Sequence, residues 1–160
     1  MNKSNAHSVE SLKNAIKSLS VADKMLTQTF KMLQDPKILV AVLENVFQAF
    51  KFGIISLFQY DESNDFLSTI KNNFQIIFEE FQINVAKKYS LGEFIKLIDE
   101  IQMLRSGHKD ASVEFSKKEI YVMCSQDYDC EVLSDEKLRK FIKEAKLFIK
   151  RLEKIMLKNG

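Results

Sequence analysis

The sequence predicts an all-α protein, a five-helix up-and-down bundle with a short β-hairpin or extended segment before the last helix. Apolar residues recur at three- and four-residue steps in five segments, which is the period of an amphipathic helix. Only one proline and four glycines occur in 160 residues, which favours long uninterrupted elements. The stretch 105–133 alone combines β-branched and aromatic residues with turn residues, which is typical of a hairpin.

The chain is long enough to form one domain, 1–160, with a flexible tail at 1–7. A chain of this length buries roughly 70% of the surface that it exposes when unfolded, so it needs neither a disulfide nor a metal for stability. No apolar signal segment is visible at the N-terminus. The most apolar run, 38–58, contains four polar or charged residues, Glu44, Asn45, Gln48 and Lys51. We therefore expect a cytoplasmic protein with no membrane span and no cofactor.

The first two helices are predicted over 8–34 and 36–60. Ser8 is a suitable N-cap for the first helix. Pro36 disfavours helical geometry in the residue before it and suits the first turn of the next helix, so it separates the two. The second helix is apolar on most sides and should be the most buried element.

A strip of small residues lies along this second helix. Its members are Ala49, Gly53 and Ser56. Close packing against another helix of the same chain explains such a strip, and the seam of a homodimer is the alternative.

Three further helices follow. They are predicted over 66–89, 91–104 and 135–157. Ser90 and Glu93 have the spacing of a capping box at the start of the fourth helix, and Ser134 is a suitable N-cap for the last. The side chains that we expect to be mostly buried are Phe47, Phe50, Ile54, Phe74, Phe78, Phe141, Phe148 and Leu152.

The stretch 105–133 between the last two helices contains two strand-like runs, 119–125 and 130–133. They predict at most one small hairpin, which should lie against the bundle or a partner because a lone hairpin is marginal in water. Cys124 and Cys130 could face each other across it. Ordinary thiols are the expected state of cysteines in a protein that is not exported, and a disulfide or a zinc site is the alternative.

Arg105, His108 and Lys109 are candidates for chemistry at the end of the fourth helix. A histidine can act as a general acid or base, and an arginine can hold a phosphate with two hydrogen bonds. Together they could support RNA cleavage, in which a base activates a ribose hydroxyl. The simpler interpretation is that these cations complement the dipole at the helix C-terminus.

The polar side of the last helix carries a basic stripe. It consists of Arg139, Lys143, Lys146, Lys150, Lys154 and Lys158. The helix holds nine basic and four acidic residues in a chain whose net charge is only +2. Such a row of cations can follow a phosphate backbone and release counterions, although a solvated helix face has the same composition. Glycine-rich phosphate loops, H-E-x-x-H motifs and nucleophile elbows do not occur in the sequence.

The layout over 8–158 and the segment HKDASVEFSKKEIYVMCS at 108–125 resemble small archaeal HEPN-like helical proteins. The resemblance implies a helical bundle that is often dimeric. It also implies a metal-independent ribonuclease or toxin, or a substrate-binding partner of a nucleotidyltransferase. Active HEPN members carry an arginine and a histidine separated by four to six residues, whereas only two residues separate Arg105 from His108.

We therefore expect a non-catalytic module that binds RNA or a protein partner through its basic last helix and the 105–133 segment, and a homodimer is a further expectation. The candidate anion contacts are Lys109, Arg139, Lys143, Lys146, Lys150 and Lys154. The alternative is a divergent metal-independent ribonuclease that uses His108 and Arg105.

Overall fold

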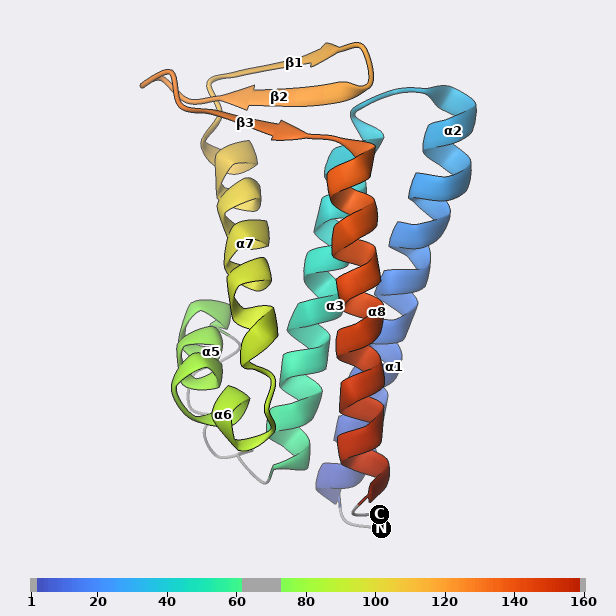
Figure 1. Cartoon of the computed structure of the whole chain (residues 1–160), viewed down its shortest axis with the longest axis vertical. Helices are drawn as coiled ribbons and strands as arrows, with labels where there is room; N and C mark the ends of the chain where they lie inside the picture. The colour runs from blue at the N-terminus through green and yellow to red at the C-terminus, as the bar shows by residue number, and fades with distance from the viewer. Residues whose placement is uncertain (1–2, 62–72, 159–160) are drawn as a thin grey trace.

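Three long helices form the body of the protein in a computed structural model that describes residues 3–61 and 73–158 (Figure 1). They are α1 (Lys3–Lys24), α3 (Ile38–Tyr60) and α8 (Asp135–Lys158). A π-helical turn, η1 (Met25–Thr29), and the short α2 (Phe30–Leu33) continue α1 to the far end of the body. The two described ends of the chain lie next to each other, because α1 and α8 are neighbours.

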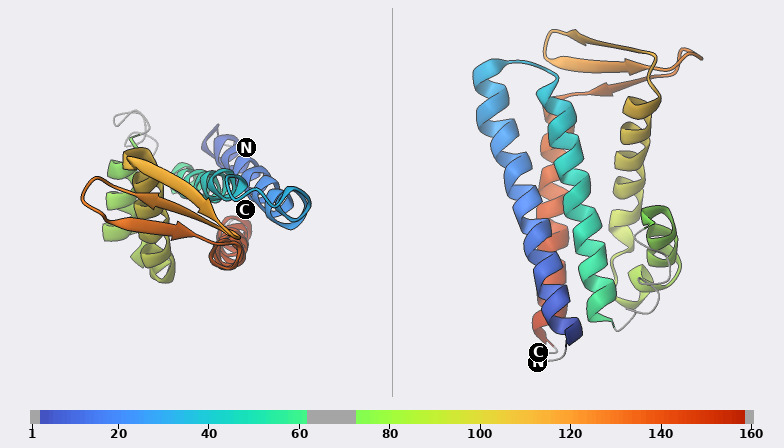
Figure 2. Two further views of the ribbon diagram at one scale, coloured as in Figure 1. Left: turned by 90° about the horizontal axis from the view of Figure 1, so that it is seen from above. Right: turned by 180° about the vertical axis from the view of Figure 1, so that it is seen from behind.

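A second group of helices packs on α3, on the side away from α1 (Figure 2). It consists of α5 (Phe74–Glu80), η2 (Phe81–Val85), α6 (Ala86–Lys88), the 3₁₀ turn η3 (Gly92–Phe94) and α7 (Ile95–Asp110). The mostly helical architecture is therefore confirmed. The predicted stretch 66–72 of the third helix, which includes Phe66 and Ile70, lies outside the described residues.

A three-stranded antiparallel sheet covers the end of the body where α7 stops and α8 begins. Its strands, in the order β1-β2-β3, are β1 (Val113–Lys117), β2 (Ile120–Cys124) and β3 (Cys130–Leu133). The prediction of at most one hairpin is therefore wrong by one strand. The missing strand was β1, whose two apolar side chains, Val113 and Phe115, are exposed at 57% and 44% and so carry no core-facing pattern.

The small-residue strip of α3 packs against α8. A Cβ on Gly53 would lie 2.9 Å from Phe148 Cε1 and 3.0 Å from Leu152 Cδ1, so only a glycine allows this approach. Ala49 and Ser56 are buried as well. Packing within the chain is confirmed for this strip, and a homodimer seam at these residues is excluded because they are not accessible.

Phe148 lies at the centre of the core. Its ring centroid is 5.2 Å from that of Phe50, 5.1 Å from that of Phe94 and 6.5 Å from that of Phe81. These rings come from four different elements, so one aromatic cluster joins the body to the second group of helices. The predicted core residues are all buried except Phe74, which is half-buried.

Helix boundaries depart from the predictions at three places. Ser8 is buried within α1, which begins at Lys3, and its Oγ donates to the Ser56 carbonyl at 2.9 Å, so it is not an N-cap. Ser90 has φ 58° and terminates α6 in the left-handed conformation, so the predicted capping box does not form. The helix predicted to end at residue 104 continues to Asp110. Ser134 is confirmed as an N-cap, because its Oγ accepts from the Lys137 N–H at 3.2 Å.

Helix α3 is the one described helix long and apolar enough to cross a membrane, with a mean hydropathy of 1.7 in its most apolar window. Half of that window is buried inside the protein. This length and hydropathy are weak evidence for a membrane span, because the central helix of a bundle has the same properties.

Candidate functional site

The basic surface is defined here as nine exposed cations of two neighbouring segments, five from α8 and four from α1–α2. From α8 it contains Arg139, Lys143, Lys146, Lys150 and Lys154, all exposed as the stripe predicts. From α1 and α2 it contains Lys13, Lys17, Lys24 and Lys31, which are also exposed. The two rows belong together because α1 and α8 pack side by side, and Lys146 Nζ lies 3.0 Å from Asp23 Oδ2 of α1. The side chain of Lys158 lies outside the described part of the chain.

The basic surface reflects an uneven division of charge. Residues 3–33 hold five basic and two acidic residues, and α8 holds nine and four, which gives +8 for the two together. Residues 34–134 hold ten basic and sixteen acidic residues, or −6. The fold therefore concentrates positive charge on the side formed by the first and last helices, and an anionic partner would be attracted to that side.

Some cations of the basic surface form ion pairs with carboxylates, and others do not. Arg139 is 3.1 Å from Asp135 one turn earlier, and Lys146 is held by Asp23. Among the described residues, no ion pair involves Lys143, Lys150 or Lys154. Among the α8 cations of the basic surface, these three lysines are therefore the most available phosphate contacts.

A pocket of about 320 Å³ lies at the α2 end of the basic surface, beside the turn between β1 and β2. Its walls are Leu26, Thr27, Phe30, Lys31, Gln34, Glu119, Asp135 and Arg139. Lys31 and Arg139 bring the two basic rows together here, but Glu119 and Asp135 balance their charge. The pocket therefore offers both hydrogen-bond donors and acceptors above an apolar floor.

Arg105 is bound to α3 and does not project freely. Its Nε and Nη2 donate to the two carboxylate oxygens of Glu44 at 2.8 and 3.0 Å, and its guanidinium carbon lies 3.5 Å from the centroid of the Phe47 ring. Burial alone would raise the pKa of Glu44, but the hydrogen bonds from Arg105 and Gln48 outweigh it and lower that pKa. This arrangement links α7 to α3.

His108 joins α7 to the sheet. Its Nδ1 lies 2.9 Å from Glu114 Oε2 on β1, and Glu114 in turn is hydrogen-bonded to the hydroxyl of Tyr121 on β2. The bond to Glu114, followed by burial, raises the pKa of Tyr121 to about 12. Arg105 and His108 lie on the same helix, but each is bound to a different carboxylate, and Lys109 is exposed beside them.

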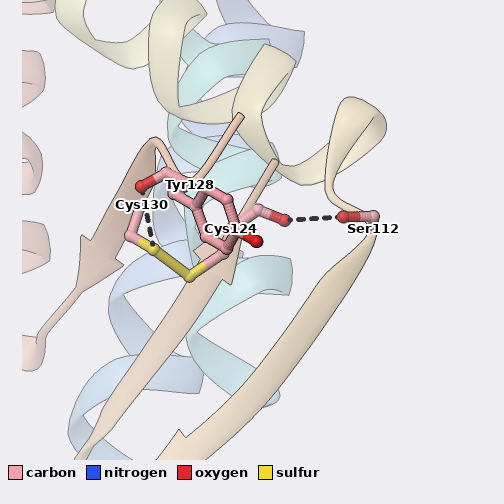
Figure 3. Close-up of a disulfide and its surroundings, with 4 residues drawn as sticks. All are labelled: Ser112, Cys124, Tyr128 and Cys130. Carbon is pink, nitrogen blue, oxygen red and sulfur yellow. Dashed lines mark hydrogen bonds between the residues drawn. A yellow bond between two sulfur atoms is a disulfide. The ribbon is translucent and has the colours of Figure 1, made fainter. Parts of the chain in front are cut away.

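Cys124 and Cys130 form a disulfide across the β2–β3 hairpin (Figure 3). The two residues are direct partners in the strand register, with Cα atoms 4.1 Å apart. The predicted facing across a hairpin is confirmed, but the expected pair of reduced thiols is wrong. Reduced thiols were expected because a cytoplasmic location was expected, and disulfides are rare in a reducing cytosol. A cytoplasmic location stays a prediction.

Several functional contacts were absent from the sequence-based set. Glu44, Glu114 and Tyr121 partner the candidate residues from other elements, and no local signal identifies them. The lysines of α1 did carry a signal, since Lys17, Lys24 and Lys31 recur at seven-residue steps on one helix face. Among the described residues, no group of three or more His, Cys, Asp or Glu could hold a metal ion.

Comparisons of the chain with protein-family models, characterised proteins and solved structures find no match. The helical bundle is thus defined by its own structure, and the resemblance to HEPN-like proteins stays a prediction.

Proposed function

We propose that this protein is a non-catalytic helical-bundle module that binds RNA along the basic surface formed by α1–α2 and α8. The observation that carries the proposal is the division of charge: two neighbouring helical segments hold +8, while the rest of the chain holds −6. A polyanion on this side would gain from counterion release, and the net negative charge of the rest of the chain would disfavour binding elsewhere.

The dimensions of the basic surface suit a nucleic-acid backbone. Arg139 and Lys154 are fifteen residues apart, so the α8 row is about 22 Å long. The row of α1 lies beside it, which widens the surface to two lines of cations. Contacts between these cations and phosphates carry no sequence information, so the proposal predicts binding with little sequence preference.

The contacts of Arg105 and His108 support a structural role for both residues. A catalytic arginine in a ribonuclease would have to offer its donors to a phosphate, but Nε and Nη2 of Arg105 donate to Glu44. His108 is bound to Glu114 and links the sheet to α7. The ribonuclease alternative would have to operate with Arg105 paired to Glu44 and with Nδ1 of His108 held by Glu114, which leaves Nε2 for proton transfer.

The proposal is tested by measuring the affinity of a fluorescently labelled single-stranded RNA, with a DNA of the same sequence as second probe. Lys143→Gln combined with Lys150→Gln should weaken binding by about 25-fold at 0.1 M salt. Each phosphate contact with a single strand contributes about 0.7 to the slope of log affinity against log salt, which is about fivefold in affinity at 0.1 M relative to 1 M salt. The matched control is Lys87→Gln combined with Lys96→Gln, which removes the same charge from α6 and α7 and should change the affinity little.

RNA cleavage is measured in the same samples. Intact RNA with wild-type protein is the expected result. Cleavage that disappears in His108→Ala would replace the proposal with the ribonuclease alternative. Equal weakening by the two lysine pairs would show that the charge of the whole protein, and not the basic surface, attracts the RNA.

A further inference from the structure

The sheet presents an apolar face to solvent, which we call the outer face. Side chains alternate along each strand, and Tyr121, Met123 and Leu133 point into the core. The strand register therefore assigns the other set to the outer face, namely Val113, Phe115, Lys117, Ile120, Val122, Cys124, Cys130 and Val132. Val122 is only 9% exposed yet lies outside the main core, as expected for a residue covered by Phe115 and Val132 in neighbouring strands.

The outer face consists almost entirely of apolar side chains and the disulfide. Seven of its eight side chains are apolar or belong to the disulfide, and Val113 and Phe115 are exposed at 57% and 44%. Large exposed apolar patches on soluble proteins often mark interaction sites, and this face is at the lower end of that size range. The views in Figure 2 show no described element lying over this face.

The two ends of the outer face carry opposite charge. The β1–β2 turn at one end exposes two cations, Lys117 and Lys118, and one anion, Glu119, which leaves a net charge of +1. The β2–β3 loop at the other end exposes Asp127 and Asp129. A face that is positive at one end and negative at the other is complementary to itself when one copy is turned end over end.

The ends also differ in shape. Tyr128 protrudes from the β2–β3 loop with 91% of its surface exposed. A shallow concavity of about 480 Å³ at the opposite end is lined by Lys117, Lys118, Glu119 and Ile120. The arrangement that pairs the charges also brings the protruding tyrosine of one copy towards the concavity of the other.

We propose that two copies of the chain pack their outer faces together about a two-fold axis, with their strands running in opposite directions. The Lys117–Lys118 turn of each copy then meets the loop of its partner, and the partner's Tyr128 enters the concavity. The apolar side chains form a thin layer between two sheets, as in a β-sandwich. The basic surface is not part of this contact, so the dimer is independent of RNA binding.

The small size of the face predicts how tight the dimer is. Three strands of about five residues cover about 14 by 17 Å. A standard interface buries roughly 800 Å² on each partner, so the sheet face alone is small and the dimer is reversible. We expect a dissociation constant between about 1 μM and 1 mM.

Sedimentation velocity of the full chain, from about 0.1 μM to 1 mM, tests the dimer. Wild type should change from monomer to dimer over this range, and Phe115→Lys should stay monomeric. The matched control is Met103→Lys, which introduces the same charge on α7. Met103 is apolar and 60% exposed, and it lies outside the outer face. Far-UV circular dichroism and the thermal midpoint verify that each variant folds.

The orientation is tested by charge reversal. Lys117→Glu with Lys118→Glu, and separately Asp127→Lys with Asp129→Lys, should each weaken self-association at least tenfold. An equimolar mixture of the two variants should associate better than either variant alone, because the reversed ends meet correctly in the mixed dimer. A wild type that is monomeric at 1 mM, a dimer that tolerates Phe115→Lys, or a mixture with no gain would overturn the proposal.

Discussion

The guanidinium of Arg105 on α7 lies over the ring of Phe47 on α3, with its central carbon 3.5 Å from the ring centroid. Two hydrogen bonds to Glu44 hold the same guanidinium in this position. One side chain thereby fixes the distance and rotation between α7 and the body. This contact bears directly on whether Arg105 serves the fold or the chemistry.

Arg105→Ala should lower the free energy of unfolding by about 1–2 kcal/mol. Hydrogen bonds to charged groups contribute about 1.5–3 kcal/mol, and the half-exposed carboxylate of Glu44 reduces that amount through solvent screening. Arg105→Lys should recover only part of the loss because it keeps the charge but not the planar fork. Urea denaturation measures the effect. An unchanged midpoint in Arg105→Ala would show that the residue is free for another role.

Gly53→Ala and Gly107→Ala should have opposite effects, although both replace a glycine inside a helix. Alanine favours a helix by about 1 kcal/mol over glycine at each position. At Gly53 the new Cβ would lie 2.9 Å from a ring atom of Phe148, and overpacking of this kind costs about 1–3 kcal/mol. At Gly107 the nearest atom is Glu131 Cγ at 3.2 Å, on a side chain that can move.

Thermal unfolding compares the two glycine variants. Gly107→Ala should raise the midpoint and Gly53→Ala should lower it. Stabilisation by both would show that the contact between α3 and α8 can widen without cost.

The free energy of unfolding should fall as the pH rises from about 10 to 12, in part because of Tyr121. Its pKa is raised to about 12 in the folded protein, above the ordinary value of 10. The unfolded chain therefore loses the tyrosine proton first, and stability that is complete below pH 10 is lost through the folded pKa. Burial and a bond to Asp61 also raise the pKa of Tyr89, which adds to the decline.

Tyr121→Phe should flatten this decline, and unfolding in urea at pH 9 and pH 11 measures the difference. Tyr128→Phe is the control, because Tyr128 is almost fully exposed. The same slope in wild type and Tyr121→Phe would argue against the bond between Tyr121 and Glu114.

Reduction of the disulfide should lower the stability of the sheet by about 2 kcal/mol, the chain-entropy value for so short a loop. Only the β2–β3 hairpin is constrained by the bond, so the helical circular dichroism should persist. Hydrogen exchange in β2 and β3, with and without a thiol reductant, measures the change. Cys124→Ser with Cys130→Ser should reproduce the reduced state and no longer respond to the reductant.

The parts of the fold that follow from helical periodicity could be predicted from the sequence. The buried faces of α3 and α8 and the cap at Ser134 are examples, since each depends on residues within one helix. Strand β1 could not be predicted, because Val113 and Phe115 face solvent and Glu114 faces inward to meet His108. This exchange of the apolar and polar faces of β1 can be recognised only once the strand register is known.

Contacts between elements account for the rest of what the sequence could not show. The bond between Arg105 and Glu44 joins residues that are 61 positions apart. The basic surface was recognised on α8 alone, because the adjacency of α1 and α8 depends on how the bundle closes. The disulfide was discounted on an assumption about compartment, although the spacing of Cys124 and Cys130 allowed it.

The central claim is that RNA lies on the basic surface, and the salt dependence of RNA affinity tests it most directly. The logarithm of the association constant is plotted against the logarithm of the salt concentration for wild type, for Lys143→Gln with Lys150→Gln, and for Lys87→Gln with Lys96→Gln. Each lost phosphate contact reduces the slope by about 0.7 for a single strand. We predict a slope that is shallower by about 1.4 in the first variant and unchanged in the second; equal slopes for all three proteins would contradict the claim.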